Sequence, residues 1–203
     1  MKKASIILFN IKNINKDLIK DTFIVGCDRG ALNCASNDIF MDLAVGDFDS
    51  VDEVEFELIK KYSKKIIKLN PIKDSTDTQY AIDYLKDYDE ITIYGGIKGK
   101  RIEHFYANMI DLYNNKKLRM MDDNSLIITS EDSFNPLTNY KFISIFSLSN
   151  DTIISLKGLK YELDDYNLLM NNPLGISNEV SNNPLISIKK GRILVIYSND
   201  DKR

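Results

Sequence analysis

The chain has 203 residues, 43% hydrophobic and 28% charged, which is typical of a globular protein with one large domain or two small ones. Its net charge of −3, from 27 basic and 30 acidic residues, does not favour nucleic acid or an anionic membrane as the main partner. No apolar stretch approaches the roughly 20 residues that a membrane span needs. The two cysteines, Cys27 and Cys34, lack metal-type spacing and are expected to be reduced thiols in a cytoplasmic protein.

The first 120 residues or so alternate short apolar runs with helical patterns. Strands are expected at five apolar runs, 4–9, 22–27, 42–45, 65–69 and 90–95. Helices are expected at 52–62, 78–88 and 103–115, where apolar residues recur every three or four positions. The apolar part of the start, MKKASIILFN, is too short for a signal peptide, so we interpret it as the first strand. This alternation predicts an α/β domain with a mainly parallel sheet over residues 1–121.

After about residue 120 the apolar runs become short and strand-like. They lie at 119–123, 125–130, 140–148, 151–158, 184–190 and 191–198. Turn signals such as NNPLG and SNNP separate them, and no helical pattern of useful length remains. This pattern predicts a second, small all-β domain, sandwich-like, over residues 122–203. Because so small a unit buries a limited core alone, we expect it to pack on the first domain or on another subunit.

Acidic residues follow three of the expected strands. Asp28 follows 22–27, Asp47 and Asp49 follow 42–45, and Asp74 and Asp77 come shortly after 65–69. In an open α/β sheet, ligands bind at the carboxyl ends of the strands. If 47–49 is extended, its two acidic side chains point the same way and can converge on one cation. A set of oxygen ligands suits Mg²⁺, which shares itself with substrate phosphates.

A structural interpretation competes with the metal site. Ser50 and Glu53 have the spacing of a capping box at the start of the next helix, so this acidic stretch could be a capped turn. Thr76 and Gln79 form a second such pair, which places Asp77 in a first helical turn, where the helix dipole favours acids. One acidic turn alone favours the structural interpretation, whereas three acidic strand ends in one sheet favour a metal–phosphate site.

A glycine-rich loop joins the strand at 90–95 to the helix at 103–115. It contains Gly95, Gly96 and Gly99 together with the cations Lys98, Lys100 and Arg101. Glycines permit close backbone approach, and the start of the following helix can bind an anion. The spacing matches neither a Walker loop nor a dinucleotide fingerprint. His104, the single histidine, has a side chain whose pKa is near neutral, but a lone histidine there is more often structural.

Together these motifs resemble the bacterial thiamine pyrophosphokinase family. The stretches that carry the resemblance are CDRGA (27–31), VGDFDS (45–50), KDSTDTQYAI (73–82), GGIKGKRIEH (95–104), GLKYEL (158–163) and GISNE (175–179). They occur in the order found in the family and cover nearly the whole chain. GDFDS followed by D-x-T-D is the most specific of them.

The resemblance implies an enzyme, an ATP:thiamine diphosphotransferase that forms thiamine diphosphate and AMP. It implies Mg²⁺ as cofactor, ATP as co-substrate, an N-terminal domain that binds ATP, a C-terminal domain that contributes to thiamine binding, and a homodimer. By position, it assigns the metal and the catalysis to Asp47, Asp49 and Asp77, with Arg101 as a further catalytic residue. It assigns nucleotide binding to Asp28, Lys73, Asp74, Thr76, Arg101 and His104. It assigns thiamine binding to Ser177 and Asn178.

The chain departs from the family pattern at a few positions. Arg29 replaces a glycine after the first acid, and Lys100 and Glu103 replace a glycine and an aspartate of the glycine loop. The chain has no tryptophan, which some relatives stack on thiamine, so a tyrosine or an apolar side chain would have to serve.

Three other functions stay open at this point. One is a module that binds or senses thiamine or its diphosphate without transfer, although such a binder needs no Mg²⁺ cluster. Another is a different Mg-dependent phosphotransferase or phosphohydrolase, which would release ADP or phosphate instead of AMP. A structural assembly protein fits least well, because it gives the strand-end carboxylates no role.

Overall fold

The structure is a computed structural model, and it describes residues 1–9, 11, 14–72, 75–99 and 101–200. The chain divides into two compact units, Met1–Asp123 and Asn124–Arg203. No helix in these described ranges is long and apolar enough to cross a membrane. The functions expected for the two sequence-defined domains, 1–121 and 122–203, stay predictions.

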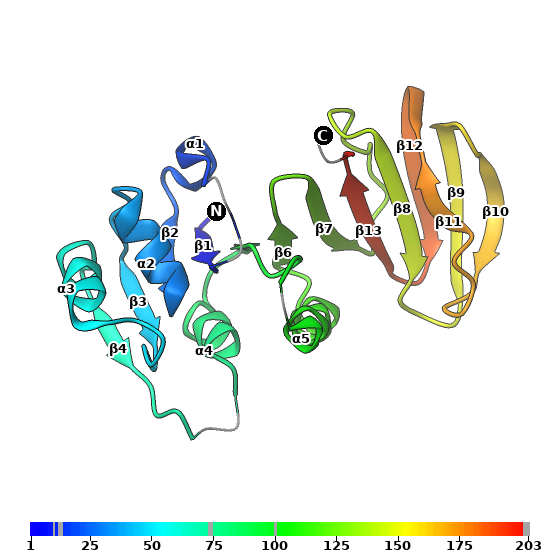
Figure 1. The fold of residues 1–203 in the computed structure, drawn as a ribbon. Helices are drawn as coiled ribbons and strands as arrows, with labels where there is room; N and C mark the ends of the chain where they lie inside the picture. The colour runs from blue at the N-terminus through cyan, green and yellow to red at the C-terminus, as the bar shows by residue number, and fades with distance from the viewer. Residues whose placement is uncertain (10, 12–13, 73–74, 100, 201–203) are drawn as a thin grey trace. The chain divides into compact units, whose positions relative to one another are not determined.

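The first unit is an α/β domain whose strands pair in parallel (Figure 1). Along its sheet the strands follow the order β6-β5-β1-β2-β3-β4. Their bounds are β1 Lys3–Ile7, β2 Phe23–Cys27, β3 Leu43–Gly46, β4 Ile66–Lys68, β5 Glu90–Tyr94 and β6 Leu118–Met121. The helices are α1 Lys16–Ile19, α2 Arg29–Ser36, α3 Glu53–Lys61, α4 Asp77–Tyr84 and α5 Ile102–Asn114. The predicted parallel α/β fold and its five strands are confirmed.

Register brings the ends of the central strands to one level. Ile7 pairs with Gly26 of β2 on one side and with Tyr94 of β5 on the other, and Cys27 of β2 pairs with Val45 of β3. The chain after β2, β3 and β5 therefore leaves the sheet at the same edge. Strand order reverses on the two sides of β1, and this is the place where open α/β sheets bind ligands.

The sequence analysis missed α2, although this helix packs closely on the sheet. Its buried residues are small, with Gly30, Ala31, Cys34 and Ala35 on one face. A Cβ added to Gly30 would lie 2.1 Å from the carbonyl oxygen of Ile7, so the helix backbone contacts the sheet almost directly. Small residues permit this approach but give a weak apolar pattern, which explains why the helix was missed.

The N-cap of helix α3 lies two residues after the predicted cap residue, Ser50. The capping box predicted for Ser50 and Glu53 is wrong, because Asp52 caps the helix instead. Its carboxylate accepts a hydrogen bond from the backbone N–H of Glu55 at 2.8 Å, and the Glu55 carboxylate accepts from the Asp52 N–H at 3.0 Å. The Asp52 and Glu55 side chains each accept a hydrogen bond from the backbone N–H of the other residue, at a spacing that the sequence analysis did not consider.

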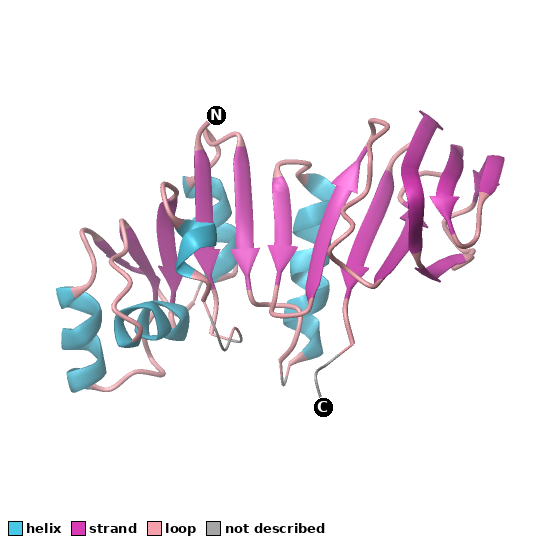
Figure 2. Ribbon diagram, turned by 90° about the horizontal axis from the view of Figure 1, so that it is seen from above, coloured by secondary structure: helices cyan, strands magenta, loops and turns pink. Residues whose placement is uncertain are grey.

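The second unit contains strands and no helix in its described part, residues 124–200, which confirms the all-β prediction (Figure 2). Its antiparallel strands form two groups, β11-β8-β13-β7 and β10-β9-β12. Their bounds are β7 Ser125–Ser130, β8 Phe142–Ser147, β9 Thr152–Leu159, β10 Leu163–Leu168, β11 Gly175–Asn178, β12 Val180–Lys190 and β13 Ile193–Ser198.

Two details of this region differ from the sequence-based expectation. The sequence did not predict β10 and β11, because β10 is largely polar and β11 has only four residues. The apolar run at 119–123, which we grouped with the second half of the chain, instead forms most of β6. That strand pairs in parallel with β5, with Ile91 opposite Leu118, and so belongs to the sheet of the first unit.

Replacing Asp52 by alanine removes the side-chain half of the α3 cap. We expect Asp52→Ala to lower the free energy of unfolding by about 1 kcal/mol, the usual loss when a capping side chain is removed. Ser50→Ala is the matched control and should leave stability near that of the unmodified protein. Urea denaturation of both variants measures the difference. Equal losses in the two variants would contradict the assignment of the cap to Asp52.

Candidate functional site

Two acidic side chains meet at the edge of the first unit where β2 and β3 end. Asp28 directly follows β2, Asp77 is the first residue of α4, and their carboxyl groups share a hydrogen bond. Burial, together with the hydrogen bond and the charge of Asp77, raises the pKa of Asp28 from 3.8 to about 7. Asp47 adds a smaller repulsion, while the Phe48 N–H, which donates to Asp28 at 3.3 Å, opposes the shift.

The backbone around Asp28 adopts a conformation that places its carboxylate inward. Asp28 has a φ of 48° and a ψ of −121°, a region that costs a residue with a side chain about 1–3 kcal/mol. Its N–H donates to the carbonyl of Val45 at 3.0 Å. A Cβ on Gly46 would lie 1.9 Å from a carboxylate oxygen of Asp28, so glycine at the end of β3 makes room for that carboxylate.

Residues 47–49 form a turn, so the condition under which Asp47 and Asp49 would point the same way, an extended segment, is not met. Phe48 has a φ of 57°, and the Asp49 N–H donates to the Asp47 carboxylate at 3.1 Å. The Phe48 ring is buried and contacts the ring of Phe56 on α3, with 5.2 Å between centroids. Asp49 is exposed beside this turn, whereas Asp47 is half-buried and lies within electrostatic reach of Asp28.

The start of α4 presents Asp77 to this edge. Thr76 is the N-cap, and its hydroxyl accepts a hydrogen bond from the Gln79 N–H at 3.0 Å, as the sequence predicts. The second half of the predicted box is wrong, because the Gln79 amide instead donates to Asp111 of α5 at 3.2 Å. The predicted site residues Lys73 and Asp74, just before this helix, lie outside the described residues.

The glycine loop leaves β5 on the other side of β1. Gly95 and Gly96 have φ values of 92° and 79°, and a Cβ on Gly96 would lie 2.6 Å from the amide nitrogen of Asn108. The same amide of Asn108 donates to the Gly96 carbonyl at 3.4 Å. The loop therefore packs against α5 in a conformation that favours glycine.

The cations of this loop sit at the start of α5. Arg101 is the N-cap residue of the helix, is 69% exposed at its side chain, and lies 3.8 Å from the Glu103 carboxylate. His104 follows in the first turn and is exposed. Lys100 lies outside the part of the chain that the structure describes. Arg101 and His104 are accessible to a ligand.

Arg29, the departure from the family pattern, has a structural role that the sequence did not reveal. Its guanidinium donates to the carbonyl of Ser50 at 2.8 Å and lies over the Phe9 ring at 5.0 Å. Arg29 thereby connects the start of α2 to the acidic turn. Only its place next to Asp28 could have indicated this role, because the contact joins segments 21 residues apart.

In the second unit, the residues predicted to bind thiamine lie on β11. Ser177 has a φ of 53°, and its N–H donates to the Ser144 hydroxyl at 3.0 Å. The buried Asn178 side chain accepts from the Tyr161 N–H at 2.9 Å and donates to the Tyr161 carbonyl at 2.7 Å. Asn178 therefore holds both backbone groups of Tyr161, whose side chain is left largely exposed.

The acidic edge is not a preformed metal cage. Among the residues that the structure describes, no group of three or more histidine, cysteine, aspartate or glutamate side chains is arranged to hold a metal ion. The paired carboxyls of Asp28 and Asp77 nevertheless concentrate negative charge, and Asp47 adds to it. An oxygen-only set of few ligands fits Mg²⁺, which usually keeps several waters and binds substrate phosphates together with one or two carboxylates.

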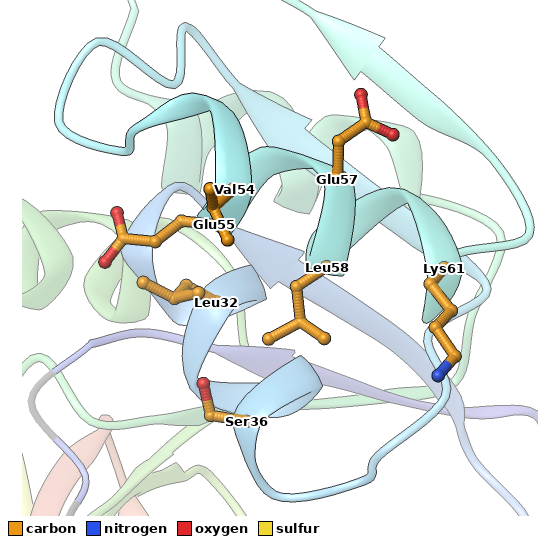
Figure 3. A pocket seen from close by; sticks show the side chains of 7 residues that line it. All are labelled: Leu32, Ser36, Val54, Glu55, Glu57, Leu58 and Lys61. Carbon is orange, nitrogen blue, oxygen red and sulfur yellow. The ribbon is translucent and has the colours of Figure 1, made fainter.

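A separate groove lies between α2 and α3 (Figure 3). Its apolar wall comes from Leu32, Val54 and Leu58, and its charged rim from Glu55, Glu57 and Lys61. None of the predicted site residues lines this groove. It is therefore distinct from the acidic edge.

The raised pKa of Asp28 predicts how stability depends on pH. Between its ordinary pKa of 3.8 and about 7, the folded protein binds more protons at Asp28 than the unfolded chain does, so its contribution to stability falls as pH rises through this window. We expect Asp28→Asn to gain stability relative to the unmodified protein between about pH 4 and pH 7, in chelator-treated samples.

The control is Asp164→Asn, at an exposed position of β10. Its difference from the unmodified protein should be the same at both ends of the pH window. Thermal or urea unfolding across the window measures these differences. A stability difference for Asp28→Asn that does not change with pH would contradict the shifted pKa.

Comparisons with known proteins show which family the chain resembles over its two parts. Residues 15–121 match the family model of the thiamin pyrophosphokinase catalytic domain, and residues 127–193 match that of the thiamin pyrophosphokinase vitamin B1 binding domain. Thiamine pyrophosphokinase of Bacillus subtilis is 31% identical over 215 residues, covering 98% of this chain and all of that protein.

Solved structures show the same fold along the whole chain. The crystal structure of thiamine pyrophosphokinase from Bacillus subtilis has a TM-score of 0.85 at 30% identity, over 98% of this chain and 100% of that one. A thiamin pyrophosphokinase family protein from Enterococcus faecalis has a TM-score of 0.84 at 24% identity, over 99% and 100% of the two chains, a likeness of fold alone. The chain therefore belongs to the thiamine pyrophosphokinase family, and its activity is that of a thiamine diphosphokinase.

Proposed function

We propose that the chain transfers the diphosphate group of ATP to the hydroxyl of thiamine, with AMP as the leaving product, at the acidic edge of the first unit. The observation that carries this location is the contact between Asp28 and Asp77, which joins two of the stretches that resemble the family. A purely structural role does not explain this contact, because the repulsion between two carboxyl groups costs free energy.

We assign ATP binding and catalysis to residues 1–121 and a contribution to thiamine binding to residues 122–203. The matches to a catalytic model and to a vitamin B1 binding model support this division. In the first domain, the residues that we assign to nucleotide binding are Asp28, Lys73, Asp74, Thr76, Arg101 and His104. The exposed Arg101 and His104 start α5, where the unpaired N–H groups of a helix and a cation favour phosphate.

We assign Mg²⁺ to Asp47, Asp49 and Asp77. The concentration of carboxylate oxygens at this edge supports the assignment, since it suits a hard cation. An ion held by Asp47, Asp49 and Asp77 would offset the negative charge of the substrate phosphates. Asp28, which hydrogen-bonds Asp77, holds one of these carboxylates in place.

The remaining chemistry is positioning and proton transfer. The thiamine oxygen forms a bond to the β-phosphorus while the bond from that phosphorus to the oxygen of AMP breaks. We assign acceptance of the hydroxyl proton to Asp49, which is exposed and so accessible to a substrate hydroxyl. Arg101 offsets the charge that develops on the phosphates.

For thiamine we assign Ser177 and Asn178, with different roles. Ser177 is partly accessible on β11 and can contact ligand, whereas Asn178 is buried and acts by holding the backbone of Tyr161. The Tyr161 side chain is 61% exposed, which makes it a candidate for the aromatic contact that the missing tryptophan would otherwise make. A ring of this kind stacks on an aromatic cation with a favourable cation–π contribution.

We propose that the active form is a cytoplasmic homodimer. The two cysteines are buried thiols, which supports a reducing compartment, and the family resemblance supports the dimer. Light scattering of the purified protein measures the assembly, and a molar mass of one chain at working concentrations would contradict it.

Replacing Asp49 or Asp77 by asparagine removes a negative charge while keeping nearly the same shape. We expect both variants to lose at least about 100-fold in turnover, because acid–base and metal roles each contribute about that much. Circular dichroism should show an unchanged fold. Asp164→Asn is the matched control at an exposed position and should keep full activity.

Mass spectrometry of the products separates the proposed reaction from its alternatives. AMP with thiamine diphosphate is the expected pair. ADP with thiamine monophosphate would indicate an ordinary kinase, and binding of thiamine without AMP would indicate a binding or sensing module. Near-normal turnover in both Asp49→Asn and Asp77→Asn would contradict the metal assignment.

Tyr161 offers an independent test of the thiamine site. We expect Tyr161→Ala to raise the KM for thiamine about tenfold with little change in the KM for ATP, since a stacking contact contributes roughly 1–2 kcal/mol. Tyr161→Phe and Tyr161→Trp keep a ring and should keep a low KM. Equal KM values for thiamine in Tyr161→Ala and Tyr161→Phe would contradict a stacking role.

A further inference from the structure

Gln79 does not make the contact that its local sequence predicts. In a complete capping box, its side chain would turn back to the N–H of Thr76, at the start of its own helix. Instead its amide crosses to α5 and donates to the carboxylate of Asp111 at 3.2 Å. The Gln79 side chain thus contacts Asp111, 32 residues along the chain, and not Thr76, three residues before it.

Asp111 lies in an environment that makes this contact important. The carboxyl is about half-buried, burial raises its pKa, and nearby Asp83 of α4 raises it further. The hydrogen bond from Gln79 acts in the opposite direction and favours the charged form. Loss of the Gln79 amide would therefore leave a half-buried carboxylate without one of the donors that stabilise it.

The bond joins the two helices that supply opposite parts of the proposed site. Gln79 lies in the first turn of α4, two residues after Asp77, and its own N–H is held by the Thr76 cap. Asp111 lies near the other end of α5, whose start carries Arg101. Figure 1 shows the two helices as neighbours in the first unit. A side-chain hydrogen bond across helices restricts the turn that carries Asp77 relative to α5.

We propose that Gln79 and Asp111 form a positioning pair that fixes the first turn of α4, and with it the carboxylate of Asp77, for binding of the divalent ion. This inference rests on the proposed function, because it takes Asp77 as a metal ligand. Neither residue touches the substrates in the proposal, and both act through the orientation of Asp77. Partners that orient a ligand typically change metal affinity or activity by 10–100-fold when removed.

The test compares two variants that break the bond with one that keeps it. Gln79→Met removes the donor at nearly constant shape, and Asp111→Leu removes the acceptor. Asp111→Asn keeps an oxygen that can accept from Gln79, and Asp164→Asn is a control at an exposed position of β10. For each variant, the Mg²⁺ concentration that gives half-maximal AMP formation is measured well below its unfolding temperature, together with the KM for thiamine.

We expect Gln79→Met and Asp111→Leu each to raise the half-activating Mg²⁺ concentration about tenfold, with the KM for thiamine unchanged. The double variant should be no worse than the more affected single variant, since both remove one interaction. Asp111→Asn and Asp164→Asn should stay within about twofold of the unmodified protein. A merely structural role would lower the unfolding temperature and leave the Mg²⁺ dependence unchanged.

Unchanged Mg²⁺ dependence in a folded Gln79→Met variant, or additive effects in the double variant, would overturn the positioning role. Gln79→Met decides the question by itself if Asp111→Leu does not fold, because it leaves the carboxylate in place. The proposed function fails separately, if the unmodified protein forms no AMP or if Asp77→Asn keeps full turnover. Loss of turnover in Asp77→Asn with no effect of Gln79→Met would reject the pair and retain the function.

Discussion

Repulsion between carboxyl groups held together by the fold is the constraint around which the first unit is organised. Asp28 and Asp77 are close enough to share a hydrogen bond, and burial together with this neighbouring carboxyl raises the pKa of Asp28 to about 7. Two charges in such a place cost free energy unless a proton or a cation lies between them. In the function that we propose, a cation lies at this edge together with the substrate phosphates, and the surrounding structure supplies the free energy that holds the two carboxyl groups close to each other.

Contacts outside the carboxyl pair offset the free-energy cost of holding it, and this cost includes backbone strain. Residues such as Asp28 and Phe48, at φ values of 48° and 57°, each cost about 1–3 kcal/mol. Burial of the Phe48 ring against Phe56 stabilises the turn by about 1.5–3 kcal/mol, the same order as the strain of one such residue. The contact from Arg29 to Ser50 joins the turn to α2. Helix α3, capped by Asp52, carries Phe56 and so holds the ring that packs against Phe48 of the turn.

The sequence predicted the parts of this arrangement that depend on repeating patterns. Alternation of apolar runs gave the parallel sheet, and the rule that ligands bind at strand ends brought Asp28 to the same edge as Asp47. It missed α2, because close packing there uses small residues such as Gly30 and Ala31 instead of an apolar stripe. It left open whether residues 47–49 are extended or form a turn, since nothing local indicates that a buried phenylalanine adopts a positive φ.

The competing caps show the limit of local patterns most clearly. Ser50–Glu53 and Asp52–Glu55 both satisfy the spacing of a capping box, and only tertiary structure decides where the helix begins. Gln79 is a second case, since its side-chain amide hydrogen-bonds to Asp111, a half-buried carboxylate on another helix. Local signals fail here at the helix that carries Asp77. This is where conflict between local and global preference is expected, because functional sites tolerate local cost for the sake of geometry.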